Sequence, residues 1–285
     1  MISDNVQIAK TVSGPVEYLD EGEGPTVLCI HGAMGGYDQS ITLGRAIGEK
    51  KYRYIAVSRP GYLGTPIKCG KTPEQQADLH ATLLDFLGIK SVIVMAISGG
   101  GPSAINFAIR HPQKCSKLVL CSTICFPQVQ KIPFSFHMMT ALAWFTPLIK
   151  SMQKKTTSNL ESTLSRSISD PDLLRKTLDN KEIMELFNVV NIGMFDQLHK
   201  RTAGTKNDII ISSGFNCNLQ SITVPTLIIH GDKDPLAPFE IHGKRLAEEI
   251  PGAKLCLLKG GEHVAIFTHN EQVRDAVKKF LNDNG

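Results

Sequence analysis

The sequence predicts an α/β fold: a mostly parallel sheet of eight strands, covered by helices on both faces, with an all-helical segment inserted between two strands. Two observations predict it. Apolar runs of strand length alternate with helix-like segments over most of the 285 residues, and this alternation implies parallel strands joined by right-handed crossovers. The alternation then stops between about residues 124 and 223, where the pattern becomes almost entirely helical.

The strands can be placed in chain order from their apolar patterns. Residues 6–12 and 16–19 flank the turn Ser13-Gly14-Pro15, which indicates antiparallel strands. Residues 26–30 form a continuous apolar run, as expected of a strand that is buried on both faces. Further strands are expected at residues 54–57, 91–96, 118–121, 226–229 and 254–258, and helices near residues 73–87, 99–111, 240–249 and 271–281.

The helical insertion, residues 124–223, interrupts a core domain made of residues 1–123 and 224–285. An insertion of this kind forms a lid, and a lid turns part of its apolar surface toward the pocket that it covers. We expect Trp144 and Met194 of the lid to contact the substrate there. Helices are expected near residues 134–153, 159–168, 170–178 and 181–200, and the next strand-like run is residues 209–211.

Charge and hydropathy exclude several classes of protein. The 31 Lys and Arg residues against 27 Asp and Glu give a formal net charge of +4, which is too weak and too dispersed to indicate nucleic-acid binding. No apolar run approaches the roughly 18 residues of a membrane span, and the start, Met1-Ile2-Ser3-Asp4-Asn5, lacks the pattern of a signal peptide. We therefore expect a cytoplasmic protein that acts on a small molecule and does not insert into a membrane.

The seven cysteines do not form a recognisable metal or disulfide pattern. Cys29, Cys121 and Cys256 lie in apolar, strand-like runs, where a reduced thiol packs as a small hydrophobe. Cys121 and Cys125 are four positions apart, but no second pair of His or Cys completes a zinc set. The sequence predicts reduced thiols and no metal.

Ser98 stands between Ala96 and Gly100, where an expected strand meets an expected helix. Small residues two places on either side allow a sharp turn, and such a turn strains its central residue and projects the side chain out of the sheet. The overlapping residues 99–104 also fit the dinucleotide pattern G-x-G-x-x-G/A, but they lie a third of the way along the chain and no acidic residue follows about 20 positions later. We therefore interpret Ser98 as a nucleophile.

This turn resembles the G-x-S-x-G motif of α/β-hydrolases, with Ala96 in place of the first glycine. The resemblance implies that fold and the chain order nucleophile, acid, histidine. The turn after residues 226–229 carries Asp232 and Asp234; the family pattern Gly-x-x-Asp selects Asp234, whereas Asp232 suits an Asx turn. His263 follows the last expected strand, downstream of the acid, and the resemblance implies that it is the base.

The oxyanion that forms when Ser98 attacks a carbonyl needs two backbone N–H donors. Gly99, next to the nucleophile, is expected to supply one. Residues 31–36, His-Gly-Ala-Met-Gly-Gly, resemble the oxyanion loop of the family, which makes Ala33 the expected second donor and Met34 the alternative. Met34 is also expected to contact the substrate.

Two further segments resemble parts of the family. Residues 58–64 resemble the Asp-x-x-Gly-x-Gly loop after the fourth strand, with Ser58 in place of the aspartate. Residues 201–208 resemble the return from the lid in one branch of the family. We interpret both segments as structural.

The sequence thus predicts a serine hydrolase with a Ser98–His263–Asp234 triad, which requires no metal and no organic cofactor. Serine at the turn excludes the relatives that use an aspartate nucleophile. A carboxylic ester with a small or medium acyl group is the expected substrate. The alternatives are hydrolysis of a C–C bond in a vinylogous diketone, and a small-molecule binding protein with little or no turnover.

Overall fold

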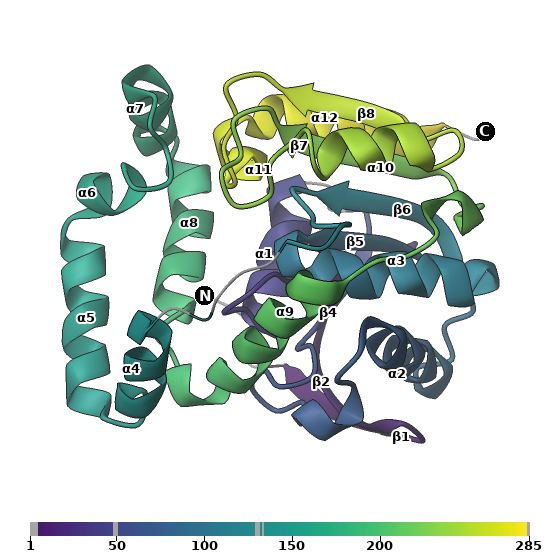
Figure 1. The fold of residues 1–285 in the computed structure, drawn as a ribbon, viewed down its shortest axis with the longest axis horizontal. Coiled ribbons are helices and arrows are strands. Elements are labelled where there is room, and N and C mark those ends of the chain that lie inside the picture. The colour runs from purple at the N-terminus through teal and green to yellow at the C-terminus, as the bar shows by residue number, and fades with distance from the viewer. Residues whose placement is uncertain (1–4, 48–50, 129–131, 133, 284–285) are drawn as a thin grey trace.

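The fold is an eight-stranded sheet with helices on both faces and a group of helices beyond one end, as the computed structural model shows (Figure 1). The structure describes residues 5–47, 51–128, 132 and 134–283. The strand order is β1-β2-β4-β3-β5-β6-β7-β8. The strands are β1 (Val6–Thr11), β2 (Gly14–Glu21), β3 (Thr26–Ile30), β4 (Arg53–Val57), β5 (Val92–Ile97), β6 (Cys115–Cys121), β7 (Thr226–Gly231) and β8 (Lys254–Leu258).

The sheet is parallel from β4 to β8, and β2 pairs antiparallel with both β1 and β4. The expected α/β fold class, a mostly parallel sheet of eight strands with helices on both faces, is therefore confirmed. Residues 1–4, which include most of the start that argued against a signal peptide, lie outside the described residues.

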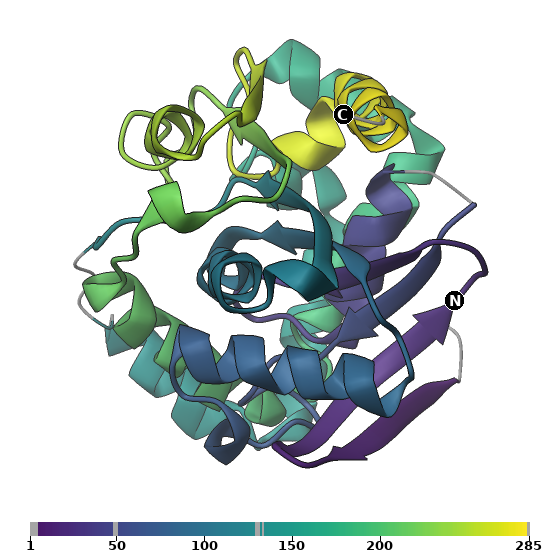
Figure 2. The same ribbon diagram turned by 90° about the vertical axis from the view of Figure 1, so that its right-hand side faces the viewer.

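Two apolar clusters hold helices against the two faces of the sheet (Figure 2). Successive side chains of a strand point to opposite faces, so Leu28 of β3 packs with one cluster and Cys29 with the other. One face is covered by α2 (Pro73–Phe86), α3 (Gly101–Arg110) and α10 (Gly243–Glu249), and the other by α1 (Tyr37–Ile47), α11 (Ala265–Thr268) and α12 (Asn270–Asn282).

The helix α1 has no counterpart among the helices expected from the sequence. Its buried residues include Ser40 and Thr42 beside Ile41 and Leu43, so the buried positions of this helix are not marked by apolar character alone. By contrast α2 begins with a capping box, in which Thr72 and Gln75 satisfy each other's backbone N–H groups, and Pro73 follows at the first position.

In the part of the segment between β6 and β7 that the structure describes, the regular structure is helical. Its α-helices are α4 (Phe134–Leu142), α5 (Thr146–Ser158), α6 (Leu160–Leu164), α7 (Pro171–Asp179), α8 (Lys181–Gly193) and α9 (Thr202–Gly214). Figure 1 shows α4 to α8 standing away from the sheet, whereas α9 returns across the core. The strand expected at residues 209–211 is wrong, because these residues lie inside α9. A short apolar run fits either element, and the buried Asp208 and Ser212, four residues apart, mark one face of a helix.

Candidate active site

Ser98 sits at the turn between β5 and α3 with a backbone φ of +53°, a conformation that costs a non-glycine residue energy. Its neighbours explain why the surrounding positions are glycine. A Cβ on Gly100 would lie 2.5 Å from the His31 carbonyl oxygen, and one on Gly101 would lie 2.6 Å from Thr123 Cβ. The strand, the helix and the loop after β3 therefore meet closely enough to hold the serine out of the sheet.

The structure brings Ser98, His263 and Asp234 together from three different loops. The Ser98 hydroxyl donates to His263 Nε2 at 3.0 Å. His263 Nδ1 lies 3.0 and 2.9 Å from the two carboxylate oxygens of Asp234. The carboxylate fixes the proton of the imidazole on Nδ1, and Nε2 is then free to accept the serine proton. This is the order of contacts that a Ser–His–Asp triad needs.

Asp234 is held by its own turn as well as by the histidine. Its Oδ1 accepts hydrogen bonds from the amides of Leu236 and Ala237, both at 2.9 Å. Burial raises the pKa of Asp234, but the hydrogen bond and charge of His263 and the Ala237 amide outweigh burial, so its pKa lies below the usual value. The carboxylate is therefore ionised at neutral pH.

The neighbouring Asp232 does not face His263. Its Oδ1 accepts the Gly260 amide at 2.7 Å, which joins the turn after β7 to the turn after β8. The structure thus gives Asp232 a role in shaping the turn. His230, which is buried near the end of β7, donates from Nε2 to the Ala237 carbonyl at 2.7 Å and supports the same loop.

The loop after β3 places Ala33 beside the nucleophile. A Cβ on Gly99 would lie 3.6 Å from the Ala33 nitrogen, so the amides of Ala33 and Gly99 are neighbours. The amide of Met34 instead donates to Thr205 Oγ1 at 3.2 Å. Of the two donors that the sequence left open on this loop, the Ala33 amide thus lies near Gly99, whereas the Met34 amide is already used in a hydrogen bond within the protein.

Comparison with known proteins agrees with this arrangement. A family model described as "alpha/beta hydrolase fold" matches residues 25–270. The chain belongs to this family of α/β-hydrolases.

The relatives of this α/β-hydrolase include proteins named as hydrolases. It is 30% identical over 258 residues to the "Uncharacterized hydrolase YcgS" of Bacillus subtilis (strain 168), with 88% of this chain and 89% of the relative covered. It is 26% identical over 275 residues to the "2-hydroxy-6-oxononadienedioate/2-hydroxy-6-oxononatrienedioate hydrolase 2" of Pseudomonas putida, covering 93% and 91%. A solved structure, "Alpha/beta hydrolase fold protein from Nakamurella multipartita", matches with a TM-score of 0.84 and 27% identity over 98% of this chain and 100% of that one.

A cavity of about 290 Å³ opens onto Ser98 and His263. Met34 and Met194, which the sequence predicted to contact the substrate, are among the residues that line it. Larger cavities, of about 360 to 430 Å³, lie along α12 and contain neither Ser98 nor His263, so the chemistry points to the smaller one. Its lining consists of Gly32, Ala33, Met34, Gln39, Leu43, Ile97, Ser98, Val190, Met194, Leu236, His263, Val264, Ile266 and Phe267.

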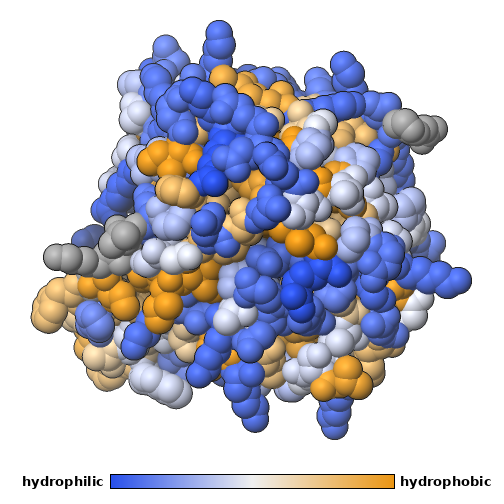
Figure 3. Space-filling model, turned by 45° about the vertical axis from the view of Figure 1, so that its right-hand side comes forward, coloured by the Kyte–Doolittle hydropathy of each residue, from blue (hydrophilic) through white to orange (hydrophobic). Residues whose placement is uncertain are grey.

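Trp144, which the sequence predicted to contact the substrate, is not among the residues that line this cavity. Its side chain is 73% exposed, and its ring packs against His199 with the centroids 4.2 Å apart. It follows α4, whose Phe134, Met138 and Leu142 recur every four residues and are also exposed. Figure 3 shows apolar side chains gathered at the lower left of the face that it draws. The indole thus belongs to the outer surface of the lid, a location that its apolar character alone does not reveal.

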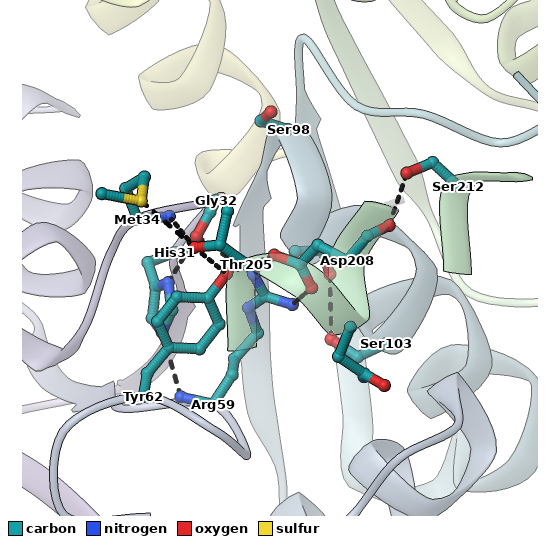
Figure 4. Close-up of polar contacts among 12 residues, drawn as sticks. His31, Gly32, Met34, Arg59, Tyr62, Ser98, Ser103, Thr205, Asp208 and Ser212 are labelled. Atoms are coloured by element: carbon teal, nitrogen blue, oxygen red, sulfur yellow. Dashed lines mark hydrogen bonds and ion pairs between the residues drawn. The ribbon is translucent and has the colours of Figure 1, made fainter. Parts of the chain in front are cut away.

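A buried polar cluster beneath the oxyanion loop was not expected from the sequence (Figure 4). Arg59 donates to both carboxylate oxygens of Asp208, at 2.8 and 2.6 Å, and the Tyr62 hydroxyl donates to the same carboxylate at 2.5 Å. Arg59 and Tyr62 belong to the segment 58–64, and Asp208 and Thr205 to the segment 201–208. The two segments that we interpreted separately therefore meet at one place.

The described part of the chain offers no group of three His, Cys, Asp or Glu side chains arranged to hold a metal ion. None of its helices combines the length and the apolar character needed to cross a bilayer.

Proposed function

We propose that this hydrolase cleaves carboxylic esters with an uncharged, small or medium acyl group through an acyl-enzyme on Ser98. The observation that carries the proposal is the hydrogen bond of 3.0 Å between Ser98 and His263 at the wall of an apolar cavity. Apart from the triad histidine, no lining residue of this cavity carries a charged side chain. An apolar acyl group is therefore the chemistry that this pocket fits best.

The proposed reaction has two halves. In the first, Ser98 Oγ attacks the ester carbonyl, His263 Nε2 takes the serine proton, and the negative charge that forms on the carbonyl oxygen faces the amides of Ala33 and Gly99. The histidine then gives its proton to the departing alcohol. In the second half, His263 activates water, which releases the acid from Ser98. Asp234 stabilises the imidazolium in both halves.

C–C hydrolysis is the second candidate, because several relatives, at 25–27% identity, are named for it. Their named substrates are dioates and so carry two carboxylates. Burying such charges requires cationic partners, and no Lys or Arg lines the cavity here. This difference favours an uncharged ester over a dicarboxylate substrate.

Labelling with a fluorophosphonate tests the nucleophile. We expect the wild type and an exposed-serine control, Ser151→Ala, to be labelled, and Ser98→Ala to remain unlabelled while folded. A series of p-nitrophenyl esters from acetate to laurate then measures the acyl preference, and Ser98→Ala should lower kcat by about 10⁴-fold or more.

Two outcomes would contradict the proposal. Faster turnover of 2-hydroxy-6-oxononadienedioate than of any ester would identify a C–C hydrolase. Folded wild type without labelling or turnover would favour the binding-protein alternative.

A further inference from the structure

The carbonyl oxygen of Gly32 accepts hydrogen bonds from two buried side chains. His31 Nδ1 donates to it at 2.6 Å, and Arg59 Nη2 donates to it at 3.0 Å. Both side chains are fully buried. Hydrogen bonds from a charged donor are stronger than neutral ones, so this carbonyl is held firmly on the side of the loop that faces the polar cluster of Figure 4.

The other end of the same peptide group is the amide of Ala33. A trans peptide is planar, and its C=O and N–H bonds point in opposite directions; the described residues contain no cis peptide. The Arg59 side chain therefore directs the Ala33 N–H away from the cluster. Ser98 is close to this peptide group, since a Cβ on Gly32 would lie 3.0 Å from Ser98 Cβ and 3.5 Å from Ser98 Oγ.

We propose that Arg59 is a positioning residue of the oxyanion hole, which aims and polarises the Ala33 N–H through the Gly32 carbonyl. The inference rests on the proposed function, because it assigns Ala33 to the oxyanion of that reaction. A cation at the carbonyl end of a peptide draws electron density toward it and makes the N–H at the other end a better donor. Arg59 thus acts on the reaction without touching the substrate.

Asp208 holds the Arg59 side chain in the position that this proposal requires. It accepts from Nη1 and Nη2 of the guanidinium, and the same Nη2 also donates to Gly32. A Cβ on Gly99 would lie only 3.2 Å from Asp208 Oδ2, so the carboxylate is close to the residue proposed as the second oxyanion donor. Alone it would repel a developing oxyanion, and the positive charge of Arg59 and the hydroxyl of Tyr62 offset that repulsion.

His31 supports the same peptide as a neutral ring. Burial and the nearby charge of Arg59 hold the pKa of His31 well below its usual value. Its Nδ1 donates to Gly32, so its Nε2 accepts the Arg59 amide at 3.0 Å. The imidazole therefore joins the segment 58–64 to the oxyanion loop without adding a charge of its own.

The test compares a tetrahedral ligand with a ground-state ligand. An alkyl trifluoromethyl ketone reacts with Ser98 as an ester does: Oγ bonds to the carbonyl carbon, the proton moves to His263, and the ketone oxygen becomes an oxyanion. The matching secondary alcohol fills the pocket but forms no oxyanion. Arg59→Met should weaken inhibition by the ketone and lower kcat/KM by about 10- to 100-fold, with KM and the affinity of the alcohol changed by less than about twofold.

Arg201→Met is the matched control, because Arg201 also forms a buried ion pair at the start of α9, and on the loop it donates to the Met34 carbonyl, at 3.5 Å, whose peptide group carries the Gly35 N–H and not that of Ala33. It should lower stability without changing the ratio of ketone to alcohol affinity. If Arg59→Met does not fold, Arg59→Lys keeps the charge and should lose an intermediate part of the ketone affinity.

Equal losses for ketone and alcohol, or a kcat/KM of Arg59→Met within about twofold of the wild type, would show that Arg59 is merely structural while leaving the proposed esterase intact. A wild type that neither hydrolyses esters nor binds the ketone would overturn both proposals.

Discussion

Arg201 and Asp38 form a two-point ion pair in the interior of the protein. Nη1 of the arginine lies 3.1 Å from Oδ1 and Nη2 lies 2.7 Å from Oδ2, with the side chains 1% and 8% exposed. Asp38 belongs to the first turn of α1, just after the oxyanion loop, and Arg201 precedes α9. The pair therefore joins the end of the lid to the catalytic side of the core.

Breaking this pair should destabilise the fold. Arg201→Met leaves Asp38 buried without its partner, so the free energy of unfolding should fall by about 3–5 kcal/mol in urea denaturation. The double variant Arg201→Met/Asp38→Leu should lose less, because no charge is left buried. Arg166→Met, on the exposed surface of the lid, should stay within about 0.5 kcal/mol of the wild type. A double variant less stable than Arg201→Met would contradict this account.

Two glycines of α9 should respond in opposite ways to alanine. A Cβ on Gly204 would lie 2.2 Å from Cε2 of Tyr62, so Gly204→Ala should lower the free energy of unfolding by about 1–3 kcal/mol. A Cβ on Gly214 would meet no atom within 4 Å, and Gly214→Ala should leave stability unchanged or raise it by up to about 1 kcal/mol. Thermal and urea unfolding measure both. Equal effects would mean that helix propensity, and not the Tyr62 contact, decides.

The two aspartates of the turn after β7 should differ in activity. Asp234→Asn removes the charge that orients and stabilises His263, so kcat on an ester should fall by about 10⁴-fold. Asp232→Asn loses only a turn contact with Gly260, and kcat should fall less than about tenfold. Steady-state kinetics of both variants with p-nitrophenyl esters separates these roles. A greater loss in Asp232→Asn would reassign the acid.

Buried histidines should make the fold sensitive to mild acid. Burial lowers the pKa of His80 to about 3 and that of His242 to about 4. In the unfolded chain a histidine binds a proton below about pH 6.5, so between that pH and the folded pKa the unfolded state holds more protons. Stability is therefore present above pH 6.5 and is lost as the pH falls, by up to about 1.4 kcal/mol per pH unit for each such histidine.

Urea unfolding between about pH 4 and 7 measures this slope. His80→Leu should reduce it by about 1.4 kcal/mol per pH unit, because the leucine has no proton to bind. His137→Gln, at an exposed position of α4, should leave the slope unchanged. A slope unaffected by His80→Leu would mean that His80 is protonated in the folded protein.

Substrate preference should depend on Met194 and not on Trp144. Met194 lines the cavity, so Met194→Ala enlarges it and should move the optimum of the p-nitrophenyl ester series toward longer acyl chains. Trp144 is on the outer surface, and Trp144→Ala should leave the ranking of esters unchanged. The ratio of kcat/KM values along the series is the measurement. A shifted optimum in Trp144→Ala would indicate that the lid closes further over the site.

The candidate catalytic residues could be predicted because each belongs to a short motif of neighbouring residues in the sequence. Ser98, Asp234 and His263 each follow a strand, and parallel strands bring their carboxyl ends to one edge of the sheet. The sequence therefore placed these residues without any knowledge of their distances. The same holds for the strands β3 and β8, whose predicted and observed bounds agree.

What could not be predicted depends on neighbours that are distant in the chain. Arg59 and Asp208 are separated by 149 positions, and neither segment shows which charge its residues meet. Trp144 and Met194 are both apolar lid residues, and only the path of the lid decides which one faces the cavity. Residues 209–211 fit a strand or a helix equally well until the buried face of α9 is known.

The helix α9 limits how much of the helical insertion could be replaced by that of another α/β-hydrolase. Its Thr205 accepts the Met34 amide and its Asp208 holds Arg59, so part of the catalytic loop is supported from within the insertion. A graft that replaced the whole of residues 124–223 with the lid of another member would remove that support together with the pocket wall. A transplant that ends before Arg201 keeps the support from α9 and replaces the part of the pocket wall that the insertion supplies, Val190 and Met194. The lining of the pocket would then be exchanged while the contacts that hold the catalytic loop stay in place.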